Sequence, residues 1–586
     1  MTSSELLDKL LEKRGLHTKE DKESFLNPNY ERDILDPFLM RDMEKSCERI
    51  LSAIQNNEKI LIYADYDCDG IPGAVILNDL FEKLNYKNFD VYIPQRNSEG
   101  YGLNTESVER MKEDEVKVLI TIDLGITAIE EVADAQKHGI DVIVTDHHLP
   151  HAEIPKAFAI LNPKCDEYPE KMLCGAGVAF KLAQGILKYL ANTQRNIRDD
   201  QKNLALPGQS ANDGEYLPGI LSEDSFKQFP KISIPDGWDK WLLDMAGLAT
   251  LSDMVPLLGE NRAIAYFGMK VLKKSPRPGL KALLRKTKIA QEYLTEDDIG
   301  FMITPRLNAA SRMDDPRRAF ELLATKDVAE GETLANHLSN INDERKNLVK
   351  SIMRDINKKF EKREHTEVIV IGNPTWKVGV LGLIAGKITD EYKRPAFVWG
   401  RDENDVIKGS CRSDGSVSVV ELMTETKEHF TEFGGHEGAG GFSVHNDKIH
   451  FLEEALCKSF MIVKKEVSTT VEYNYDLKLS LDDISMQNWK EIEKMAPFGL
   501  ANPKPMFLFE NIPVTSMKKF GKAEEHLEFI FTNSRGQKIK AISFFSTPES
   551  FTKTPAIGEP ISLLATFDLS RFAGRVELRL RVEDIV

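Results

Sequence analysis

Residues 59–163 constrain the fold of this chain more than any other stretch, because short apolar runs alternate there with helical patterns. The helical patterns include residues 71–84 and 127–138, and the apolar runs read KILIYADYD, FDVYIP, VKVLITID, IDVIVTDHH and AFAIL. Runs rich in Ile and Val that are apolar on both faces are typical of parallel strands covered by helices. The alternation predicts an α/β fold built on a doubly wound parallel sheet.

Carboxylate and imidazole groups follow three of these predicted strands. They are Asp65, Asp67 and Asp69 after the first run, Asp123 after the third, and Asp146, His147 and His148 after the fourth. Right-handed crossovers bring the carboxyl ends of parallel strands to one edge, where open α/β sheets bind ligands. We therefore expect these groups to meet in one cleft. A lone Asp at a strand end is often a turn or helix cap, and for Asp65 this alternative stays open.

A cleft with this many carboxylates favours divalent cations, because neighbouring negative charges raise one another's pKa values. Oxygen ligands with one or two imidazoles suit Mn²⁺ or Mg²⁺ better than structural zinc, which favours thiolates. Two such ions about 3.5–4 Å apart clamp the attacking and leaving oxygens in phosphodiester hydrolysis. The pattern thus predicts two divalent metal ions, Mn²⁺ or Mg²⁺, and phosphoester chemistry.

The rest of the chain divides by pattern. Residues 193–236 are polar and rich in Asn, Gln, Gly and Pro, which predicts a long loop or insertion. Residues 329–362 have a helical apolar period and predict a long connector helix. A second α/β unit follows, and short strands separated by turn residues then predict a small β-barrel. The expected domains are 1–328 (with an N-terminal extension and the insertion), the connector helix 329–362, 363–462 and 467–586.

Composition narrows the class of protein. The formal net charge of −16 argues against a nucleic-acid binder, but residues 465–586 carry 16 Lys/Arg and 17 Asp/Glu and are nearly neutral. No apolar run approaches the roughly 18–20 residues of a membrane span, and the N-terminus has no apolar signal core. The six cysteines include no CxxC pair, so we expect reduced thiols in a cytoplasmic protein.

The strings DYDCDG, TIDLG, TDHH and SDMVPL, in this order, resemble the motifs of the DHH phosphoesterases. From about residue 10 to the end, the chain is more closely similar to the RecJ single-stranded-DNA exonucleases of that superfamily. Further matching segments are IPQRNSEGYGLN, LCGAGVAFKL, TPRLNAASRMDDP, GVLGLIAGKI, KGSCRS, FGGHEGAGGF and PFGLANPKPMF. The resemblance implies a DHH domain, a DHHA1-like second domain and a terminal oligonucleotide-binding (OB) barrel.

The resemblance also implies an activity and a set of site residues. The activity is two-metal hydrolysis of single-stranded DNA from its 5′ end, in DNA repair and recombination. By matching motif, the catalytic metal ligands would be Asp67, Asp69, Asp123, Asp146, His147 and Asp253. His148 would orient these ligands or act near the scissile phosphate.

Substrate-binding residues are implied by the same motifs. They are Arg96, Arg306, Asn308, Ser410, Arg412, Gly434, Gly435 and His436. Guanidinium groups form paired, charge-assisted hydrogen bonds with phosphate, and surface ion pairs are the alternative for the arginines. The glycines either let backbone N–H groups approach phosphate or only close a tight turn. His436 either reaches a phosphate or braces that turn.

In the predicted barrel, basic residues are interleaved with Phe520 and Phe572, which fits backbone contacts plus base stacking on a single strand. The alternative is a charged outer face with aromatic residues in the core. The basic residues are Lys518, Lys519, Lys522, Lys538, Lys540, Arg571, Arg575, Arg579 and Arg581.

The chain departs from the family pattern at a few positions. Lys377 follows Trp376 where a His is usual, which weakens any role carried over for that position. Cys68 replaces a usual Ala, and Ser311 stands where Gly is common. The predicted metal ligands are not affected by these changes.

We expect a metal-dependent exonuclease whose partner is single-stranded DNA. A single-strand-binding protein or a helicase are candidate protein partners, and we expect a monomer without membrane attachment. One alternative is a DHH phosphodiesterase acting on short oligonucleotides or cyclic dinucleotides. The other is a non-catalytic DNA-binding scaffold, which predicts lost ligands, whereas every predicted ligand is present.

Overall fold

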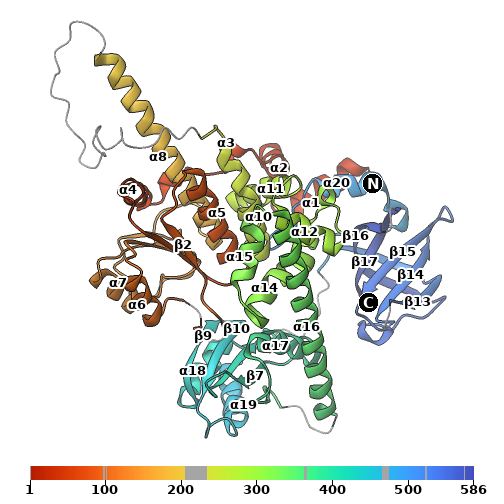
Figure 1. Ribbon diagram of the computed structural model, residues 1–586. Coiled ribbons are helices and arrows are strands. Elements are labelled where there is room, and N and C mark those ends of the chain that lie inside the picture. Colours follow the sequence, from red (N-terminus) through yellow and green to blue (C-terminus); the bar gives the residue numbers. More distant parts are fainter. Residues whose placement is uncertain are drawn as a thin grey trace. The chain divides into compact units, whose positions relative to one another are not determined.

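The computed structural model describes residues 2–96, 99, 100, 102–204, 234–361, 366–464, 474–521, 524–572 and 575–586. Most of the predicted insertion at 193–236 lies outside the described residues, as do Lys522 and the side chain of Phe572. The chain forms two compact units (Figure 1). One comprises Leu35–Val255 and Phe267–Ser468, and the other comprises Met1–Ile34, Pro256–Tyr266 and Thr469–Val586.

The predicted parallel sheet is confirmed in the larger unit. Its strand order is β2-β1-β3-β4-β5, and all neighbours run parallel. The strands are β1 (Ile60–Ala64), β2 (Phe89–Tyr92), β3 (Val118–Ile122), β4 (Asp141–Thr145) and β5 (Ala159–Leu161). Every residue of β1 and β3 is buried. Burial on both faces explains why these strands read as continuous apolar runs rather than as alternating patterns.

Helices cover both faces of this sheet (Figure 1). On one face, α6 (Thr105–Glu113) and α7 (Ile129–Lys137) share an apolar core with β1, β3 and β4. On the other lie α4 (Met43–Gln55), α5 (Gly70–Lys83) and α8 (Gly175–Leu204). Gly73 lets α5 lie close, because a Cβ there would stand 2.6 Å from the Ile122 side chain and 3.2 Å from the Ala176 Cα.

Helix α8 is longer than the sequence indicated. Residues 193–204, predicted to begin the loop, continue α8 to Leu204. The stretch TQRNIRDDQKNL contains neither Gly nor Pro, the residues that most often end a helix. Its polarity was therefore a poor indicator of where the helix ends.

Helices connect the parallel sheet to the second α/β part. They are α10 (Leu243–Ser252), α11 (Gly259–Leu272), α12 (Pro278–Thr287), α13 (Glu296–Asp298), α14 (Thr304–Met313), α15 (Arg317–Ala324) and α16 (Val328–Phe360). α16 is the long helix predicted over 329–362. Its apolar stripe, including Leu338, Ile352 and Ile356, is buried, as the helical period requires.

The second sheet has the order β6-β7-β8-β10-β9 and is mixed. Its strands are β6 (Ile369–Gly372), β7 (Ala396–Arg401), β8 (Ile407–Arg412), β9 (Phe430–His436) and β10 (Ala439–Val444). Three helices accompany them, α17 (Leu381–Tyr392), α18 (Val419–Glu425) and α19 (Leu452–Val463). The glycine-rich string FGGHEGAGG forms the β9–β10 hairpin.

The smaller unit contains the predicted C-terminal β structure. Its strand order is β11-β12-β16-β17-β15-β14-β13. The strands are β11 (Leu477–Lys478), β12 (Phe507–Pro513), β13 (Ser516–Phe520), β14 (His526–Thr532), β15 (Lys538–Phe544), β16 (Pro560–Phe572) and β17 (Arg575–Ile585). Phe507 and Phe509 of β12 share one apolar core with Phe529 and Phe531 of β14. Strands far apart in the sheet order thus enclose a common core, as in a barrel.

The N-terminal residues belong to this smaller unit, whereas the sequence-based division assigned them to the first domain. The unit also contains α1 (Ser3–Lys13), α2 (Lys19–Leu26), α3 (Tyr30–Asp33) and α20 (Met486–Glu493). Leu6, Leu7, Leu10 and Leu11 of α1 are buried in the barrel core. The amphipathic period of α1 was readable in the sequence, but its partner is more than 450 residues away and was not.

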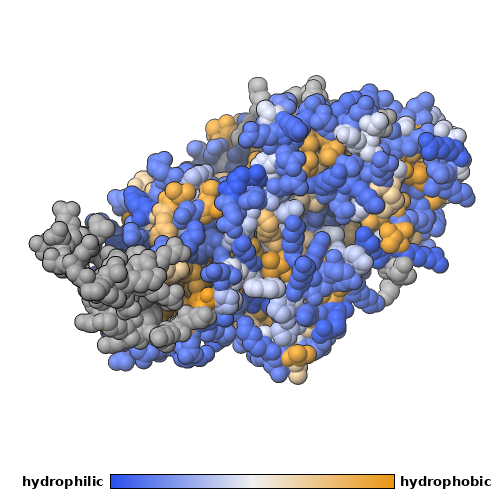
Figure 2. All heavy atoms as spheres, turned by 90° about the horizontal axis from the view of Figure 1, so that it is seen from above, coloured by the Kyte–Doolittle hydropathy of each residue, from blue (hydrophilic) through white to orange (hydrophobic). Residues whose placement is uncertain are grey.

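One face of the molecule and its described helices bear on a possible membrane-spanning part. Hydrophilic residues predominate on the face seen in Figure 2, and apolar side chains lie between them in small groups. Among the helices that the structure describes, none is both long enough and apolar enough to cross a lipid bilayer.

We predict that Leu10→Ala loosens the barrel, because truncating a fully buried leucine costs about 2–5 kcal/mol. Hydrogen–deuterium exchange of the barrel strands should become faster in this variant. The exposed neighbour Lys9 provides the control, Lys9→Ala, which should exchange like the unmodified chain. Unchanged exchange in the Leu10→Ala barrel would show that α1 is not part of its core.

Candidate metal centre

The DYDCDG segment turns sharply between β1 and α5 and fixes two carboxylates. Asp67 Oδ1 accepts hydrogen bonds from the backbone N–H groups of Asp69 (2.8 Å) and Gly70 (3.4 Å). Asp69 accepts from the N–H groups of Gly175 (2.6 Å) and Ala176 (2.7 Å), at the N-terminus of α8. The helix N-terminus favours a carboxylate at this place.

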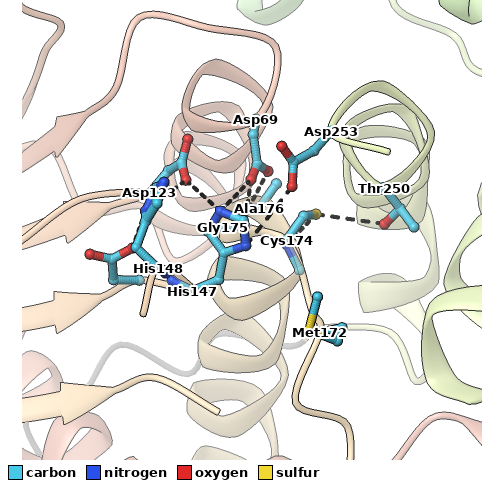
Figure 3. Close-up of polar contacts among 12 residues, drawn as sticks. Asp69, Asp123, His147, His148, Met172, Cys174, Gly175, Ala176, Thr250 and Asp253 are labelled. Atoms are coloured by element: carbon cyan, nitrogen blue, oxygen red, sulfur yellow. Dashed lines mark hydrogen bonds and ion pairs between the residues drawn. The ribbon is translucent and has the colours of Figure 1, made fainter. Parts of the chain in front are cut away.

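His147 lies among three carboxylates from separate chain segments (Figure 3). Its Nε2 is 3.1 Å from Asp123 Oδ1 and 3.7 Å from Asp69 Oδ2, and its Nδ1 is 3.9 Å from Asp253 Oδ2. Asp253 follows α10, a segment that strand topology alone does not place. A Cβ on Gly175 would lie 2.5 Å from the Asp123 Cβ, so a glycine is required there for this approach.

Asp146 is held differently. Its Oδ1 accepts from the backbone N–H groups of His147 (2.7 Å) and His148 (3.0 Å) and lies 2.8 Å from His148 Nδ1. Its Oδ2 accepts from the N–H of Ile126 (2.9 Å). The carboxylate thus positions both histidines in this structure, and its role as a metal ligand stays a prediction.

Ligand atoms converge in four groups in the described part of the chain, and three of these groups lie at the carboxyl edge of the parallel sheet. Asp123 belongs to two of them, which would allow it to serve neighbouring cations. The three groups at this edge, each with ligand atoms within 4.8 Å of one another, are Asp65, Asp67 and Asp123; Asp69, His147 and Asp253; and Asp123, His147 and His148. Asp65, for which a capping role stayed open, therefore lies inside the cluster.

The electrostatics of this cluster are unfavourable without cations. Burial, reinforced by neighbouring carboxylates, raises the pKa of Asp69 to about 6 and that of Asp253 to about 9. Burial likewise raises the pKa values of Asp65 and Asp123 well above their ordinary range. Burial lowers the pKa of His147 to about 3, and the charge of His148 adds to this shift. A neutral imidazole is the form that binds metal.

Divalent cations fit this donor set. Asp65 Oδ1 is buried and has no hydrogen-bond partner among the described residues, which is costly for a carboxylate oxygen. The donors are carboxylates with two imidazoles, as Mn²⁺ and, to a lesser degree, Mg²⁺ prefer. The site can therefore hold such ions between β1, β3, β4 and the end of α10.

Two arginines lie near the cluster, Arg96 acting on Asp65 and Arg312 on Asp67, and a third, Arg412, lies near Arg96. Arg96 stands over the Tyr66 ring with its Cζ 5.0 Å from the centroid, and Arg312 donates to the Gly379 carbonyl (3.1 Å). Arg412 donates to Ser410 Oγ (3.2 Å) and to the Cys411 carbonyl (2.7 Å). None of the three has a carboxylate within 4 Å in the ranges that the structure describes.

The arginines repel one another. Burial lowers the pKa of Arg312 to about 9, and the charges of Arg96 and Arg345 add to the shift. Burial lowers the pKa of Arg412 as well, and Arg96 contributes in the same direction. Cations that lie close without carboxylate partners are suited to an anion such as phosphate. Sequence reasoning selected Arg96, Ser410 and Arg412 but missed Arg312, which lies in the same matching segment as Arg306.

The other predicted substrate residues lie in two further places. Gly434, Gly435 and His436 are in the β9–β10 hairpin, where a Cβ on Gly435 would stand 2.3 Å from the Ala439 carbonyl oxygen. That position has a φ of 144° and supports the tight-turn alternative. Arg306 and Asn308 are on α14, where Arg306 donates to the Met302 carbonyl (2.6 Å).

The outer face of the barrel carries a row of rings. Phe520, His526 and Phe544 are register partners across β13, β14 and β15, with ring centroids 5.1 and 5.3 Å apart. Arg579 and Arg581 lie with their Cζ atoms 5.9 and 5.8 Å from the Phe544 centroid. Phe520 is therefore on the outer face and not in the core. Several predicted basic residues are ion-paired there, such as Lys518 with Glu528 (2.9 Å) and Lys540 with Glu577 (2.9 Å).

Comparison with protein families gives three matches along the chain. Residues 59–208 match the DHH family, N-terminal domain, residues 351–462 match the DHHA1 domain, and residues 475–584 match the RecJ OB domain. The matches confirm the predicted order of a DHH domain, a DHHA1 domain and an OB barrel.

Among curated relatives, the single-stranded-DNA-specific exonuclease RecJ of Bacillus subtilis (strain 168) is 32% identical. The alignment covers 99% of this chain and 67% of that protein. The protein of the same name from Escherichia coli (strain K12) is 27% identical, over 99% of this chain and 95% of its own.

Solved structures show the same fold. RecJ from Thermus thermophilus in complex with Mn²⁺ superposes with a TM-score of 0.76, at 23% identity, over 99% of this chain and 76% of that one. A structure of exonuclease RecJ bound to manganese has a TM-score of 0.57 at 26% identity, over 73% of this chain and 96% of that one.

We predict that Asp123→Asn weakens metal binding, because Asp123 belongs to two of the ligand groups. Mn²⁺ at 100 times its dissociation constant should stabilise the unmodified chain by about 2.7 kcal/mol, and the variant much less. The measurement is the melting temperature with Mn²⁺ and with EDTA.

The matched control for this experiment is Asp134→Asn. Asp134 belongs to a more exposed cluster on α6 and α7 with Glu109 and His138. This variant should respond to Mn²⁺ like the unmodified chain. An equal response of Asp123→Asn would exclude the proposed centre.

Proposed function

From the premise that the chain belongs to the RecJ family of single-stranded-DNA-specific exonucleases, we propose that it is a metal-dependent exonuclease acting on single-stranded DNA. The observation that carries this proposal is the convergence of four chain segments on one buried cluster of carboxylates and imidazoles. Arg96, Arg312 and Arg412, which have no carboxylate within 4 Å among the described residues, supply a place for phosphate near that cluster. Two-metal hydrolysis of a phosphodiester needs the ligand cluster, and the arginines would help to hold the phosphate there.

The proposed metal ligands are the residues selected from the sequence, with Asp65 added by the geometry. Asp65, Asp67, Asp69, Asp123, His147 and Asp253 belong to the converging groups, and Asp146 is retained from the family motif. Two bound Mn²⁺ or Mg²⁺ ions supply Lewis acidity for the phosphodiester and activation of water. Asp146 orients His148 through its Oδ1, and Asp69 is held in place by the α8 N-terminus.

Arg96, Arg312 and Arg412 are proposed to bind the terminal phosphate of the strand. A terminal phosphate carries up to two negative charges, whereas an internal phosphodiester carries one, so three clustered cations favour the terminal group. Ser410 Oγ lies next to Arg412, and a Cβ on Gly382 of α17 would stand 3.1 Å from both side chains. The start of α17 is therefore close to this site, and helix N-termini favour anions. With the family resemblance, this arrangement supports digestion from the 5′ end.

The barrel is proposed to bind single-stranded DNA through its own outer face. Its outer ring row of Phe520, His526 and Phe544 offers stacking surfaces for bases, and Arg579 and Arg581 adjoin it. Stacking of this kind tolerates any base sequence. We further propose a cytoplasmic monomer in DNA repair and recombination, with a single-strand-binding protein or a helicase as protein partner.

An exonuclease assay with 5′- and 3′-labelled strands tests the activity and its polarity. We expect a 5′ label to be released early as a short product and a 3′ label to remain on a shortening strand. Activity should require Mn²⁺ or Mg²⁺ and disappear with EDTA. Duplex DNA and a cyclic dinucleotide serve as comparison substrates. Preferred cleavage of the cyclic dinucleotide, or loss of the 3′ label first, would contradict the proposal.

We predict that Phe544→Ala weakens binding of a thymidine oligonucleotide by about 1–3 kcal/mol, the usual contribution of one stacked base. Fluorescence anisotropy in EDTA measures binding without cleavage. Ile557→Ala is the control, because Ile557 is also an exposed apolar residue of this unit. Equal affinities of the two variants would exclude Phe544 as a stacking residue.

A further inference from the structure

A pair of hydroxyl groups joins the end of α10 to the start of α14. Ser252 Oγ and Thr304 Oγ1 are 2.6 Å apart, and Ser252 Oγ donates to the Leu248 carbonyl (2.7 Å). A hydroxyl has one proton to donate, so Thr304 is the donor in the pair and Ser252 is the acceptor. Cys68 Sγ, from the DYDCDG segment, lies 3.4 Å from the same Ser252 oxygen. Three segments that are far apart in the sequence therefore meet at one hydroxyl oxygen.

This contact adjoins the proposed metal ligands. Ser252 directly precedes Asp253, and Cys68 lies between Asp67 and Asp69. Asp253 and Asp69 belong to the same group of converging ligand atoms. A shift of Ser252 relative to Cys68 would therefore change the distance between two carboxylates that are expected to share a cation.

Asp253 receives little support from its own helix. It is the C-cap residue of α10, and the C-terminal end of a helix disfavours a negative charge. Among the described residues its carboxylate has one cationic partner within 4 Å, His147 Nδ1 at 3.9 Å. Met254 follows with a φ of 57°, a conformation that costs a bulky residue energy and that glycine usually takes at a helix end. Contacts from outside α10 are therefore needed to hold Asp253 in place.

The backbone before Thr304 has an unusual form at this contact. Ile299–Ile303 form a π-helical turn, η4, and the Thr304 N–H donates to the Ile299 carbonyl, five residues earlier. Such turns are rare and are frequently found at functional sites. Ile299 and Ile303 are buried, and η4 packs against both α10 and α14. The π-turn thus positions Thr304 against α10.

We infer that Thr304 is a positioning residue of the metal centre, which through Ser252 fixes the location of Asp253. This inference rests on the proposed metal centre and exonuclease function. Removing a residue that orients a metal ligand commonly weakens metal binding by about 10–100-fold. Thr304 is not itself a proposed ligand, so its effect on the cation passes through Asp253.

Thr304 and Thr287 allow a matched comparison. Thr304→Val removes the hydroxyl and keeps the size and branching of the side chain. Thr287 on α12 donates to two carbonyls of its own helix, those of Leu283 and Leu284 (both 3.0 Å). Thr287→Val therefore makes the same chemical change without touching α10. Thr304→Ser keeps the hydroxyl and is the conservative variant, and Ser252→Ala removes the acceptor.

The first experiment titrates the full chain with Mn²⁺ and follows free Mn²⁺ by electron paramagnetic resonance. Thr304→Val and Ser252→Ala should weaken one of the two Mn²⁺-binding steps by about tenfold. The other step should stay nearly unchanged, because the group of Asp65, Asp67 and Asp123 does not contain Asp253. Thr304→Ser and Thr287→Val should match the unmodified chain.

Two outcomes of this titration overturn the inference. The first is a Thr304→Val titration identical to that of the unmodified chain. The second is equal weakening of both steps together with a lower melting temperature in EDTA, since Thr304 would then only support the packing of α14 on α10.

The second experiment places Thr304→Val in an Asp253→Asn background. Substitutions that act through one group are not additive, so Thr304→Val should cause little further loss of Mn²⁺ affinity there. An equal loss in both backgrounds would show that Thr304 acts on another part of the site, and the inference would be wrong.

The unmodified chain separates this inference from the proposed function. If it binds no Mn²⁺, the metal centre itself fails. If it binds Mn²⁺ but degrades no single strand, the exonuclease function fails, and the titrations still decide the role of Thr304. If it degrades the strand and Thr304→Val matches Thr287→Val in Mn²⁺ affinity, only the role of Thr304 fails.

Discussion

Crowding of carboxylates at the carboxyl edge of the parallel sheet is the constraint on which the rest of this structure depends. Asp65, Asp69, Asp123 and Asp253 lie in an environment that raises the pKa of each. The N–H groups of Gly175 and Ala176 at the start of α8 donate hydrogen bonds to Asp69 and stabilise its charged form. Only part of the negative charge is balanced in this way, and bound cations supply the rest. Without cations the charged carboxylates are unfavourable, and this electrostatic cost favours the binding of divalent ions.

The cationic groups are kept apart from this cluster but next to it. Arg96, Arg312 and Arg412 pair with no carboxylate within 4 Å in the described residues, although the net charge of the chain is −16. A protein with an acidic surface can therefore still bind a polyanion, because local charge at the site decides binding at short range. Acidic residues farther from the site than about one Debye length repel a bound polyanion only weakly, because dissolved salt screens their charge.

For Phe520 and Gly435, the residue type allows two structural roles, and packing decides between them. Phe520 is an aromatic residue in a barrel sequence and could belong to the core or to the outer face. Its register partner His526 on β14 places it outside, since the alternate residues Leu527 and Phe529 fill the core. Gly435 could serve phosphate approach or turn geometry, and its close contact with Ala439 in the hairpin supports the turn.

The sequence by itself determined the parallel sheet, the long helix, the barrel strands and the edge at which Asp67, Asp69, Asp123 and His147 meet. These features follow from local apolar periods and from the handedness of crossovers, which do not depend on distant contacts. Only the tertiary structure decided that Asp65 is inside the cluster, that Arg312 lies beside it and that α1 fills the barrel core. Those outcomes depend on which side chains meet across hundreds of residues, and no local period in the chain contains that information.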